Sequence, residues 1–206
     1  MSERLGTYAL QNRHAGAVED AELYSPVDTR HIADFDQHWK PAIHQRLRQL
    51  PRGSQTGDAD LQDWHWDWRK KADLFAGRLD YQSFALECGG MTQGLMLCSL
   101  VQVAREPSQR NQHLAYVDYV HAAPWNRRRF TDTPLYRGVG RILIAAAVSL
   151  SREQEFAGRI GLHALPQSEL WYRDRCGMTD LGIDAAYQGL RYFEMTTAQA
   201  DRFLAM

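Results

Sequence analysis

The sequence predicts a mixed α/β (α+β type) fold in which helices flank a mostly antiparallel sheet of about six or seven strands. Three strand-like segments follow one another in the middle of the chain, and a Gly89-Gly90 pair joins the first two as in a hairpin. A strand–helix–strand order comes later. Because a doubly wound parallel sheet would alternate strands and helices throughout, this order favours a mixed sheet.

Residues 1–20 are polar and irregular, and we interpret them as an N-terminal extension of a single domain over 1–206. The patterns of apolar residues then predict, in chain order, a strand at 21–25, helices at about 30–50 and 60–74, strands at 81–88, 91–104 and 114–123, a helix at 138–155, a strand at 159–165, a short helix at 166–177, strands at 178–181 and 190–195, and a helical turn or more at 197–204.

The two early helices are predicted from apolar residues at three- and four-residue steps. Asp28 or Thr29 suits the N-cap of the first helix. Pro41 lies inside the same pattern and predicts a kink or break there. In the second helix, Trp64 and Trp68 stand one turn apart, so we expect both to face the core.

The later elements are predicted from alternation and from glycine and proline. Tyr116 to Val120 alternates in the manner of a β-strand. Gly138 opens an apolar helix, Pro166 suits the first position of a short helix, and Gly177 suits its end.

Composition excludes several classes of function. The formal net charge is −1, which argues against nucleic acid as a partner, and the longest apolar run, Ile142 to Val148, is too short to span a membrane. The chain starts without a signal-peptide pattern, and its three cysteines form neither a CxxC pair nor a disulfide framework. We therefore expect a cytoplasmic protein, and the sequence leaves open whether it forms a homodimer.

One segment has the character of an anion site. The run Tyr136-Arg137-Gly138-Val139-Gly140-Arg141 leads from a loop into the apolar helix. Glycines let backbone approach a ligand, and the free N–H groups at a helix start hold phosphate. The Walker pattern and the third glycine of a dinucleotide fingerprint are both absent, so a tight turn without a ligand is the alternative.

The downstream residues resemble a known signature. Tyr172, Gly177 and Met178 follow a strand and a short helix, as in the Tyr-x₄-Gly-hydrophobe end of the GNAT family of N-acetyltransferases. The glycine turn resembles that family's Arg/Gln-x-x-Gly-x-Gly/Ala motif, and Ala122-Ala123-Pro124 resembles its Val-x-Pro. These marks cover about 80 residues in the right order. The resemblance implies a splayed strand pair that forms an acyl-CoA cleft, and acetyl-CoA as co-substrate without a metal.

The chain departs from the motif at two positions. Leu135 stands where the family usually has Arg or Gln, and Leu165 stands where an Asn is common. The contact to the cofactor arm that this Asn usually makes would then come from Gln167 or Ser168. The cofactor contacts that the resemblance implies are the backbone at Val120, His121 and Ala122, the turn Tyr136, Arg137, Gly138, Val139, Gly140 and Arg141, and the side chains of Gln167 and Tyr172. Arg127, Arg128 and Arg129 would reach the adenine 3′-phosphate, or form a solvated loop.

The resemblance also suggests catalytic roles. Tyr172 falls on the family's tyrosine position and would be the general acid. Three residues are candidates for the general base: Asp118 in an apolar strand, Glu87 near a strand end, and His163, whose pKa class suits a base near neutrality. A chain of water molecules to bulk solvent is an equal alternative.

The function implied is that of an acyltransferase, which moves the acetyl group from acetyl-CoA to a primary amine by direct attack in a ternary complex. The amine belongs to a small molecule or a protein. Two alternatives remain: a module of the same fold that binds acyl-CoA or a protein without catalysis, and an acetyltransferase acting on a macromolecule such as a protein lysine or an aminoacyl-tRNA.

Overall fold

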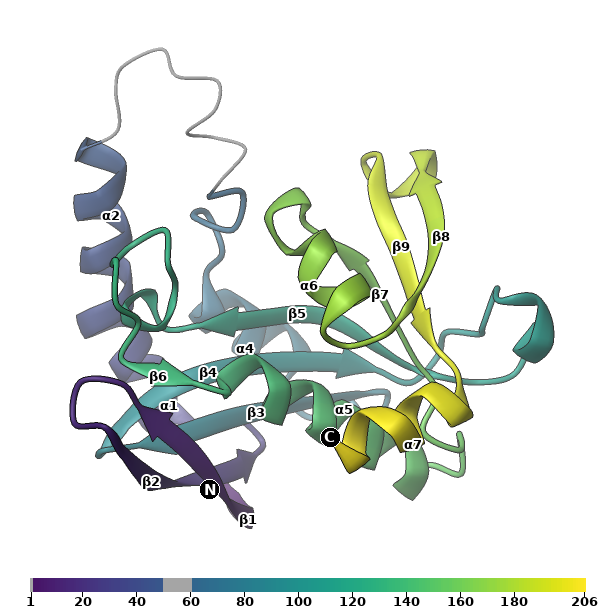
Figure 1. The fold of residues 1–206 in the computed structure, drawn as a ribbon, viewed down its shortest axis with the longest axis horizontal. Helices are drawn as coiled ribbons and strands as arrows, with labels where there is room; N and C mark the ends of the chain where they lie inside the picture. The colour runs from purple at the N-terminus through teal and green to yellow at the C-terminus, as the bar shows by residue number, and fades with distance from the viewer. Residues whose placement is uncertain (1, 50–60) are drawn as a thin grey trace. The chain divides into compact units, whose positions relative to one another are not determined.

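The computed structural model describes residues 2–49 and 61–206, and its elements are shown in Figure 1. The strands are β1 (Glu3–Asn12), β2 (Ala17–Ser25), β3 (Tyr81–Cys88), β4 (Met91–Ser99), β5 (Ala115–Ala122), β6 (Tyr136–Arg137), β7 (Ile160–Ala164), β8 (Thr179–Asp184) and β9 (Leu190–Met195). The α-helices are α1 (Thr29–Asp34), α2 (Lys40–Gln49), α4 (Trp68–Phe75), α5 (Val139–Glu153), α6 (Glu169–Asp174) and α7 (Thr197–Ala205).

The strands form one sheet in the order β6-β1-β2-β3-β4-β5-β7-β9-β8. Its neighbours are mostly antiparallel, and β5 and β7 are parallel. The predicted fold class is therefore confirmed. The sheet has nine strands rather than six or seven, because β1 and the two-residue β6 were not predicted.

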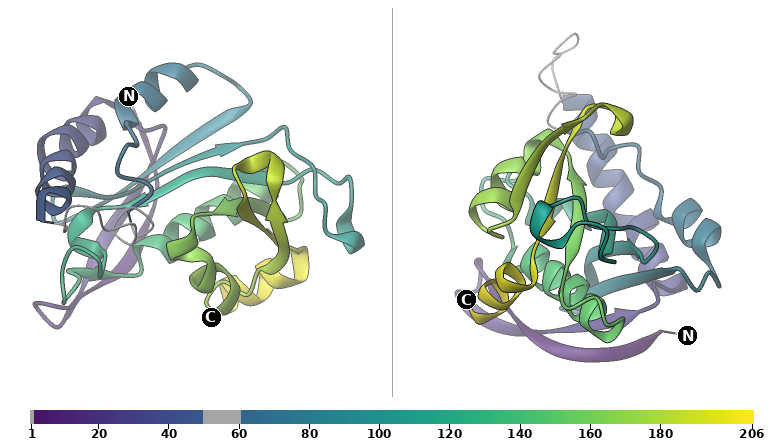
Figure 2. Two further views of the ribbon diagram at one scale, coloured as in Figure 1. Left: turned by 90° about the horizontal axis from the view of Figure 1, so that it is seen from above. Right: turned by 90° about the vertical axis from the view of Figure 1, so that its right-hand side faces the viewer.

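The chain divides into two compact units. Unit 1 comprises Met1–Met96 and Val120–Leu143, and unit 2 comprises Leu97–Tyr119 and Ile144–Met206. The strands β4 and β5 and the helix α5 each contribute residues to both units. The two further views of Figure 2 show the same elements, with the β8–β9 hairpin followed by α7 at the C-terminus.

In unit 1, an N-terminal hairpin replaces the predicted irregular extension. β1 pairs with β2 from Glu3↔Ser25 to Asn12↔Ala17, so residues 1–20 are largely strand and that part of the prediction is wrong. Asn12 holds the turn, because its Oδ1 accepts from the backbone N–H groups of His14 and Ala15 at 3.0 Å each. β2 in turn pairs with β3, for example Leu23↔Leu86.

The first helical region changes register before Pro41. Asp28 caps α1, with the His31 side chain completing a capping box. Phe35–Trp39 then form a π-helical turn, in which the N–H of Lys40 donates to the carbonyl of Phe35. The helix continues through Pro41 as part of α2, so the break predicted there is absent, and the irregularity is the π-helical turn just before it. The predicted end of this helix at Leu50 lies outside the described residues.

The second predicted helix is shorter than expected. Residues 61–67 form turns, and α4 begins only at Trp68, with Asp67 as its N-cap. The predicted start at Asp60 lies outside the described residues. Trp68 is buried, whereas Trp64 is 46 % exposed, so the prediction that both face the core is wrong for Trp64. The strand predicted at 91–104 also ends early, at Ser99.

Unit 2 is built on β7, which pairs with β9 over five positions, and on β9, which pairs with β8. α6 follows a 3₁₀ turn at Pro166–Ser168, as the proline predicted. α7 begins at a second capping box, formed by Thr196 and Gln199, and buries Phe203.

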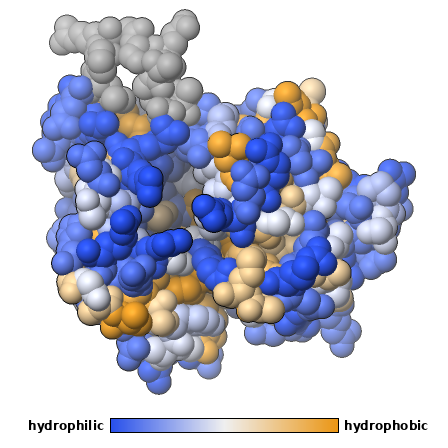
Figure 3. Space-filling view, viewed as in Figure 1, coloured by the Kyte–Doolittle hydropathy of each residue, from blue (hydrophilic) through white to orange (hydrophobic). Residues whose placement is uncertain are grey.

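On the face shown in Figure 3, hydrophilic residues predominate and hydrophobic residues lie in separate patches. No helix in the described ranges, 2–49 and 61–206, has both the length and the apolar character needed to cross a membrane.

Candidate functional site

The glycine turn lies where the sequence predicts it, between β6 and α5 in unit 1. Gly138 has a φ of +115°, a conformation that L side chains rarely adopt. The first helical hydrogen bond of α5 runs from the N–H of Ile142 to the carbonyl of Gly138, at 3.0 Å. The turn is therefore the start of a helix of 15 residues.

The turn has the electrostatics of an anion site. The first N–H groups of an α-helix have no partner inside the helix, and the helix dipole places partial positive charge there. Arg137 is exposed beside the turn, and Gly138, Gly140 and Arg141 are half-buried. A phosphate group at this place would meet backbone donors and guanidinium groups together.

β4 approaches the start of α5 closely at a second glycine. A Cβ added to Gly94 would lie 2.7 Å from Cγ1 of Val139 and 2.8 Å from Cδ1 of Leu143. Contacts that short do not occur between real Cβ atoms and their neighbours. Only glycine at position 94 lets the first turn of α5 pack directly on β4.

The parallel ladder between β5 and β7 is short. It comprises Ala115↔Ile160 and Tyr116↔Gly161 among the residues that the structure describes. β5 continues to Ala122 and β7 continues to Ala164 without further pairing to each other. The acyl-CoA cleft that the resemblance implies at this strand pair stays a prediction.

The side chain of His121 is buried in unit 1. Its Nδ1 accepts from Nε1 of Trp68 at 3.1 Å, and its Nε2 lies 3.1 Å from Nη1 of Arg127 and 3.4 Å from Oδ2 of Asp63. Burial lowers its pKa to about 3, and the nearby Asp63 carboxylate only partly opposes this shift. The ring is thus engaged on both nitrogens within unit 1, and the cofactor contact predicted for the backbone of His121 stays a prediction.

Arg127 belongs to the same cluster. Its Nη2 lies 2.9 Å from Oδ2 of the buried Asp63, and its guanidinium sits over the ring of Phe130. Its guanidinium is thus engaged with Asp63 and His121 within unit 1, and the contact predicted for it with the adenine 3′-phosphate stays a prediction. Arg128 is exposed.

Tyr172 lies on α6 in unit 2 and is buried. Burial raises the pKa of its hydroxyl well above the usual value, and Cys176 just after the same helix adds to the shift. A tyrosine in this state keeps its proton at neutral pH. The raised pKa also makes the hydroxyl a weaker acid than an ordinary tyrosine, so the shift by itself does not favour proton donation.

Gln167 precedes α6, in the 3₁₀ turn. Its Oε1 is buried and has no hydrogen-bond partner within the described chain. Buried polar atoms of this kind ordinarily have a partner, so an unpartnered amide oxygen indicates a place where a ligand or a water molecule donates. The sequence singled out this residue for a cofactor contact.

His163 is engaged on both ring nitrogens. Nδ1 lies 2.6 Å from the hydroxyl of Tyr116, and Nε2 lies 3.0 Å from Oδ2 of Asp184. Tyr187 stacks on the ring at 3.9 Å. Burial lowers the pKa of His163, against the opposing effect of Asp184.

Asp118 is half-buried on β5, two residues before Val120. It lies close enough to act on the buried thiol of Cys98, whose pKa rises chiefly by burial and further through this carboxylate. Its charge raises the pKa values of Tyr116 and Tyr119 in the same way, again after burial.

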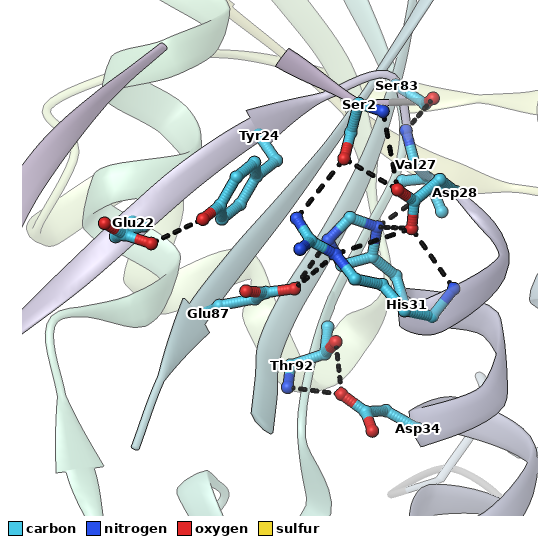
Figure 4. Close-up of polar contacts among 11 residues, drawn as sticks. Ser2, Glu22, Tyr24, Val27, Asp28, His31, Asp34, Ser83, Glu87 and Thr92 are labelled. Atoms are coloured by element: carbon cyan, nitrogen blue, oxygen red, sulfur yellow. Dashed lines mark hydrogen bonds and ion pairs between the residues drawn. The ribbon is translucent and has the colours of Figure 1, made fainter. Parts of the chain in front are cut away.

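Glu87 lies at the end of β3 in unit 1, beside the start of α1 (Figure 4). Its Oε1 is 2.9 Å from Nε2 of the fully buried His31 and 3.0 Å from Nε of Arg30. Nδ1 of His31 accepts from the N–H of Asp28 at 2.9 Å, so the neutral ring carries its hydrogen on Nε2. Burial raises the pKa of Glu87, and burial lowers that of His31 to about 4.

Sequence reasoning missed one polar residue in unit 1. Gln93 stands in β4 and is 2 % exposed, in an otherwise buried strand. A polar side chain at such a position must satisfy its hydrogen bonds internally, and that is the signal by which it would have been found. In the part of the chain that the structure describes, all three cysteines are free and buried, and no group of three or more His, Cys, Asp or Glu side chains gathers as for a metal.

Comparison with solved structures defines the class of fold. A protein of Desulfovibrio desulfuricans assigned to the GNAT family of acetyltransferases is similar over 86% of this chain and 99% of its own, with a TM-score of 0.54 and 10% identity. The PaiA N-acetyltransferase of Thermoplasma acidophilum, solved with coenzyme A, matches over 84% of this chain and 98% of its own, with a TM-score of 0.52 and 7% identity.

RimJ of Mycobacterium smegmatis, solved with CoA-disulfide, is similar over 97% of this chain and 93% of its own, with a TM-score of 0.50 and 16% identity. The chain thus has the fold of the GNAT acetyltransferases, as the sequence predicts. No protein-family model matches the sequence, and no curated protein matches it.

Proposed function

We propose that the protein is an acyltransferase that moves the acetyl group of acetyl-CoA to a primary amine by direct attack in a ternary complex. The observation that carries the proposal is the Gly138 turn, a left-handed glycine followed by the start of a helix of 15 residues. A turn of this kind supports an anion site, and it stands on a fold shared with acetyltransferases.

The diphosphate of the co-substrate would be held by backbone N–H groups at Gly138, Val139 and Gly140. These donors are fixed by the helix and cost no reorganisation on binding. Arg137 and Arg141 would add charge-assisted hydrogen bonds. Leu135, which replaces the usual Arg or Gln of the motif, leaves recognition to these groups.

The pantetheine arm would pair with the backbone of β5 near Val120, His121 and Ala122, as an added strand does. Two features support this. The β7 ladder covers only the first two residues of β5, and Gln167 has a buried carbonyl oxygen without a partner among the described residues. Such an oxygen can accept hydrogen bonds from the amide N–H groups of the arm.

The reaction needs two proton movements. A lysine-type amine has a pKa of about 10.4 and must lose a proton before it attacks the thioester. The thiolate that leaves must gain one. Tyr172, which falls on the tyrosine position of the resembled motif and is protonated at neutral pH, would donate it. A backbone N–H of β5 would polarise the thioester carbonyl.

For the proton of the amine, we favour Asp118 or a water chain over the other candidates. His163 already uses both ring nitrogens, and Glu87 lies in an ion pair with Arg30 and beside Nε2 of the neutral His31. Asp118 is on β5, the strand proposed to bind the arm.

The experiment is to incubate the protein with acetyl-CoA and a panel of small amines, peptides and RNA, while free thiol is measured. Thiol release that depends on an amine supports the proposal and identifies the acceptor class. Coenzyme A binding without acceptor-dependent release would instead favour a binding module. Release with RNA or peptides alone would favour a macromolecular acceptor.

A further inference from the structure

The residues that lead into the glycine turn are held by a chain of side-chain hydrogen bonds, all within unit 1. It starts at Gln93 on β4. Oε1 of Gln93 accepts from Nε1 of Trp125 at 2.8 Å and from Nδ2 of Asn126 at 2.9 Å. Its Nε2 donates to the carbonyl of Cys88 at 2.9 Å. The buried amide is therefore satisfied at both ends and has one orientation.

Asn126 links Gln93 to β6 by hydrogen bonds. With Nδ2 committed to Gln93, its Oδ1 accepts from the backbone N–H of Tyr136 at 2.9 Å. Asn126 belongs to the 3₁₀ turn after β5, whereas Tyr136 follows the long loop. A second bond closes the loop, from the N–H of Leu135 to the carbonyl of Trp125 at 2.9 Å.

Tyr136 is also held from the opposite side. Its hydroxyl donates to Oε2 of Glu19 at 2.7 Å, and Oε1 of Glu19 accepts from Nδ2 of Asn12 at 2.6 Å. Its backbone pairs with Asn12 in the β1–β6 ladder. Tyr136 is thus fixed through its N–H, its backbone register and its hydroxyl.

Gly138 follows Tyr136 by two residues and begins the phosphate-binding turn. A two-residue strand has little hydrogen bonding of its own to set its position. The side chains of Gln93, Asn126, Tyr136 and Glu19 supply what the short ladder lacks. In catalysis a misplacement of about 1 Å can cost about 100-fold in rate. We expect the position of this strand to matter for the ligand in the same direction.

We propose that Gln93, Asn126, Tyr136 and Glu19 are positioning residues, which hold the glycine turn in the geometry that binds the diphosphate of coenzyme A. This rests on the proposed function. Gln93, Asn126 and Glu19 are not among the expected cofactor contacts, and Tyr136, which is, acts here through its bonds to Asn126 and Glu19. Their effect is on affinity for the diphosphate, not on the rest of the cofactor.

The test compares coenzyme A with pantetheine, which lacks the diphosphate, by isothermal titration. Asn126→Ala removes the link between Gln93 and Tyr136, and should weaken coenzyme A binding by about tenfold or more while leaving pantetheine affinity unchanged. Tyr136→Phe removes the hydroxyl with its bonds to Glu19 and to the Cys88 thiol but keeps the backbone bond to Asn126, and should give a smaller loss of the same kind. It remains informative if Asn126→Ala fails to fold.

Gln109→Ala is the matched control. Gln109 is also a buried amide, in unit 2, and donates to Oε2 of Glu194 at 3.0 Å. Its loss should lower the melting temperature without changing coenzyme A affinity. The inference is overturned if both loop variants bind coenzyme A as the wild type does, or if pantetheine affinity falls equally. A wild type that binds no coenzyme A would overturn the proposed function and this inference together.

Discussion

Replacing Gly94 by alanine tests how closely β4 supports the start of α5. The added methyl would lie 2.7 Å from Cγ1 of Val139 and 2.8 Å from Cδ1 of Leu143, whereas carbon atoms in good contact are about 3.5–4.0 Å apart. Val139 and Leu143 are 3 % and 0 % exposed, so neither can swing into solvent. Val139 is also β-branched and stiff in a helix.

Overpacking of this kind costs about 1–3 kcal/mol. For a chain of this size, each kcal/mol lowers the melting temperature by roughly 2–4 °C. Thermal unfolding followed by circular dichroism measures the change. Because Val139 is adjacent to Gly138, coenzyme A affinity should fall as well, although position 94 is not a proposed ligand contact.

Gly6→Ala is the control, since its methyl would meet the Tyr8 ring at an ordinary 3.4 Å. Val139→Ala, which removes Cγ1, should partly rescue Gly94→Ala, with a coupling of about 1 kcal/mol in a double-mutant cycle. A Gly94→Ala protein as stable as Gly6→Ala, or strictly additive effects in the cycle, would refute the close packing of β4 on α5.

Three further predictions concern other residues. Tyr172→Phe should lower turnover with little change in coenzyme A affinity, and unchanged turnover in steady-state kinetics would remove Tyr172 from the mechanism. Because the pKa of His121 is about 3 in the folded protein against about 6.5 unfolded, its contribution to stability is complete above pH 6.5 and is lost as the pH falls toward 3. The free energy of unfolding, measured by urea titration, should fall by on the order of 2 kcal/mol between pH 6.5 and pH 5. In His121→Asn it should depend less on pH. An equal pH dependence in the variant and the wild type would contradict the lowered pKa of His121. Glu194 is fully buried and accepts hydrogen bonds from the backbone N–H groups of Arg105 and Glu106 and from the side chain of Gln109. Glu194→Gln should therefore destabilise the protein by about 1.5–3 kcal/mol. An unchanged urea midpoint would show that these hydrogen bonds contribute little to stability.

Local signals predicted the parts of the fold that depend on local backbone. The Gly89-Gly90 hairpin is present, with φ values of +61° and +75°. Gly138 and the helix after it lie where the glycine spacing places them. Such positions are readable because few residues other than glycine adopt these angles.

The N-terminal hairpin was missed for a physical reason. A half-buried strand is recognised by alternation of apolar and polar residues, yet Leu5 is 46 % and Val18 is 69 % exposed. Apolar residues on the solvent-facing side of the hairpin hid the two-residue alternation by which a strand is recognised. Trp64 was misplaced because its helix begins only after the Asp67 cap, so the assumed one-turn spacing to Trp68 does not exist.

The partners of the site residues were beyond reach of the sequence. His121 meets Trp68 at a separation of 53 positions, and His163 meets Tyr116 at 47. Only the folded sheet brings these pairs together. The place of the glycine turn was therefore predictable from the sequence. The hydrogen-bond partners and pKa shifts of the candidate bases were not.

The most direct test of the proposed coenzyme A site is a titration of coenzyme A into the wild type and into Gly138→Asp. We predict saturable binding to the wild type. In Gly138→Asp, a side chain and a negative charge at the turn should abolish binding, while the circular dichroism spectrum stays that of the folded protein. A wild type that does not bind, or a folded Gly138→Asp protein that binds equally well, would contradict the central claim.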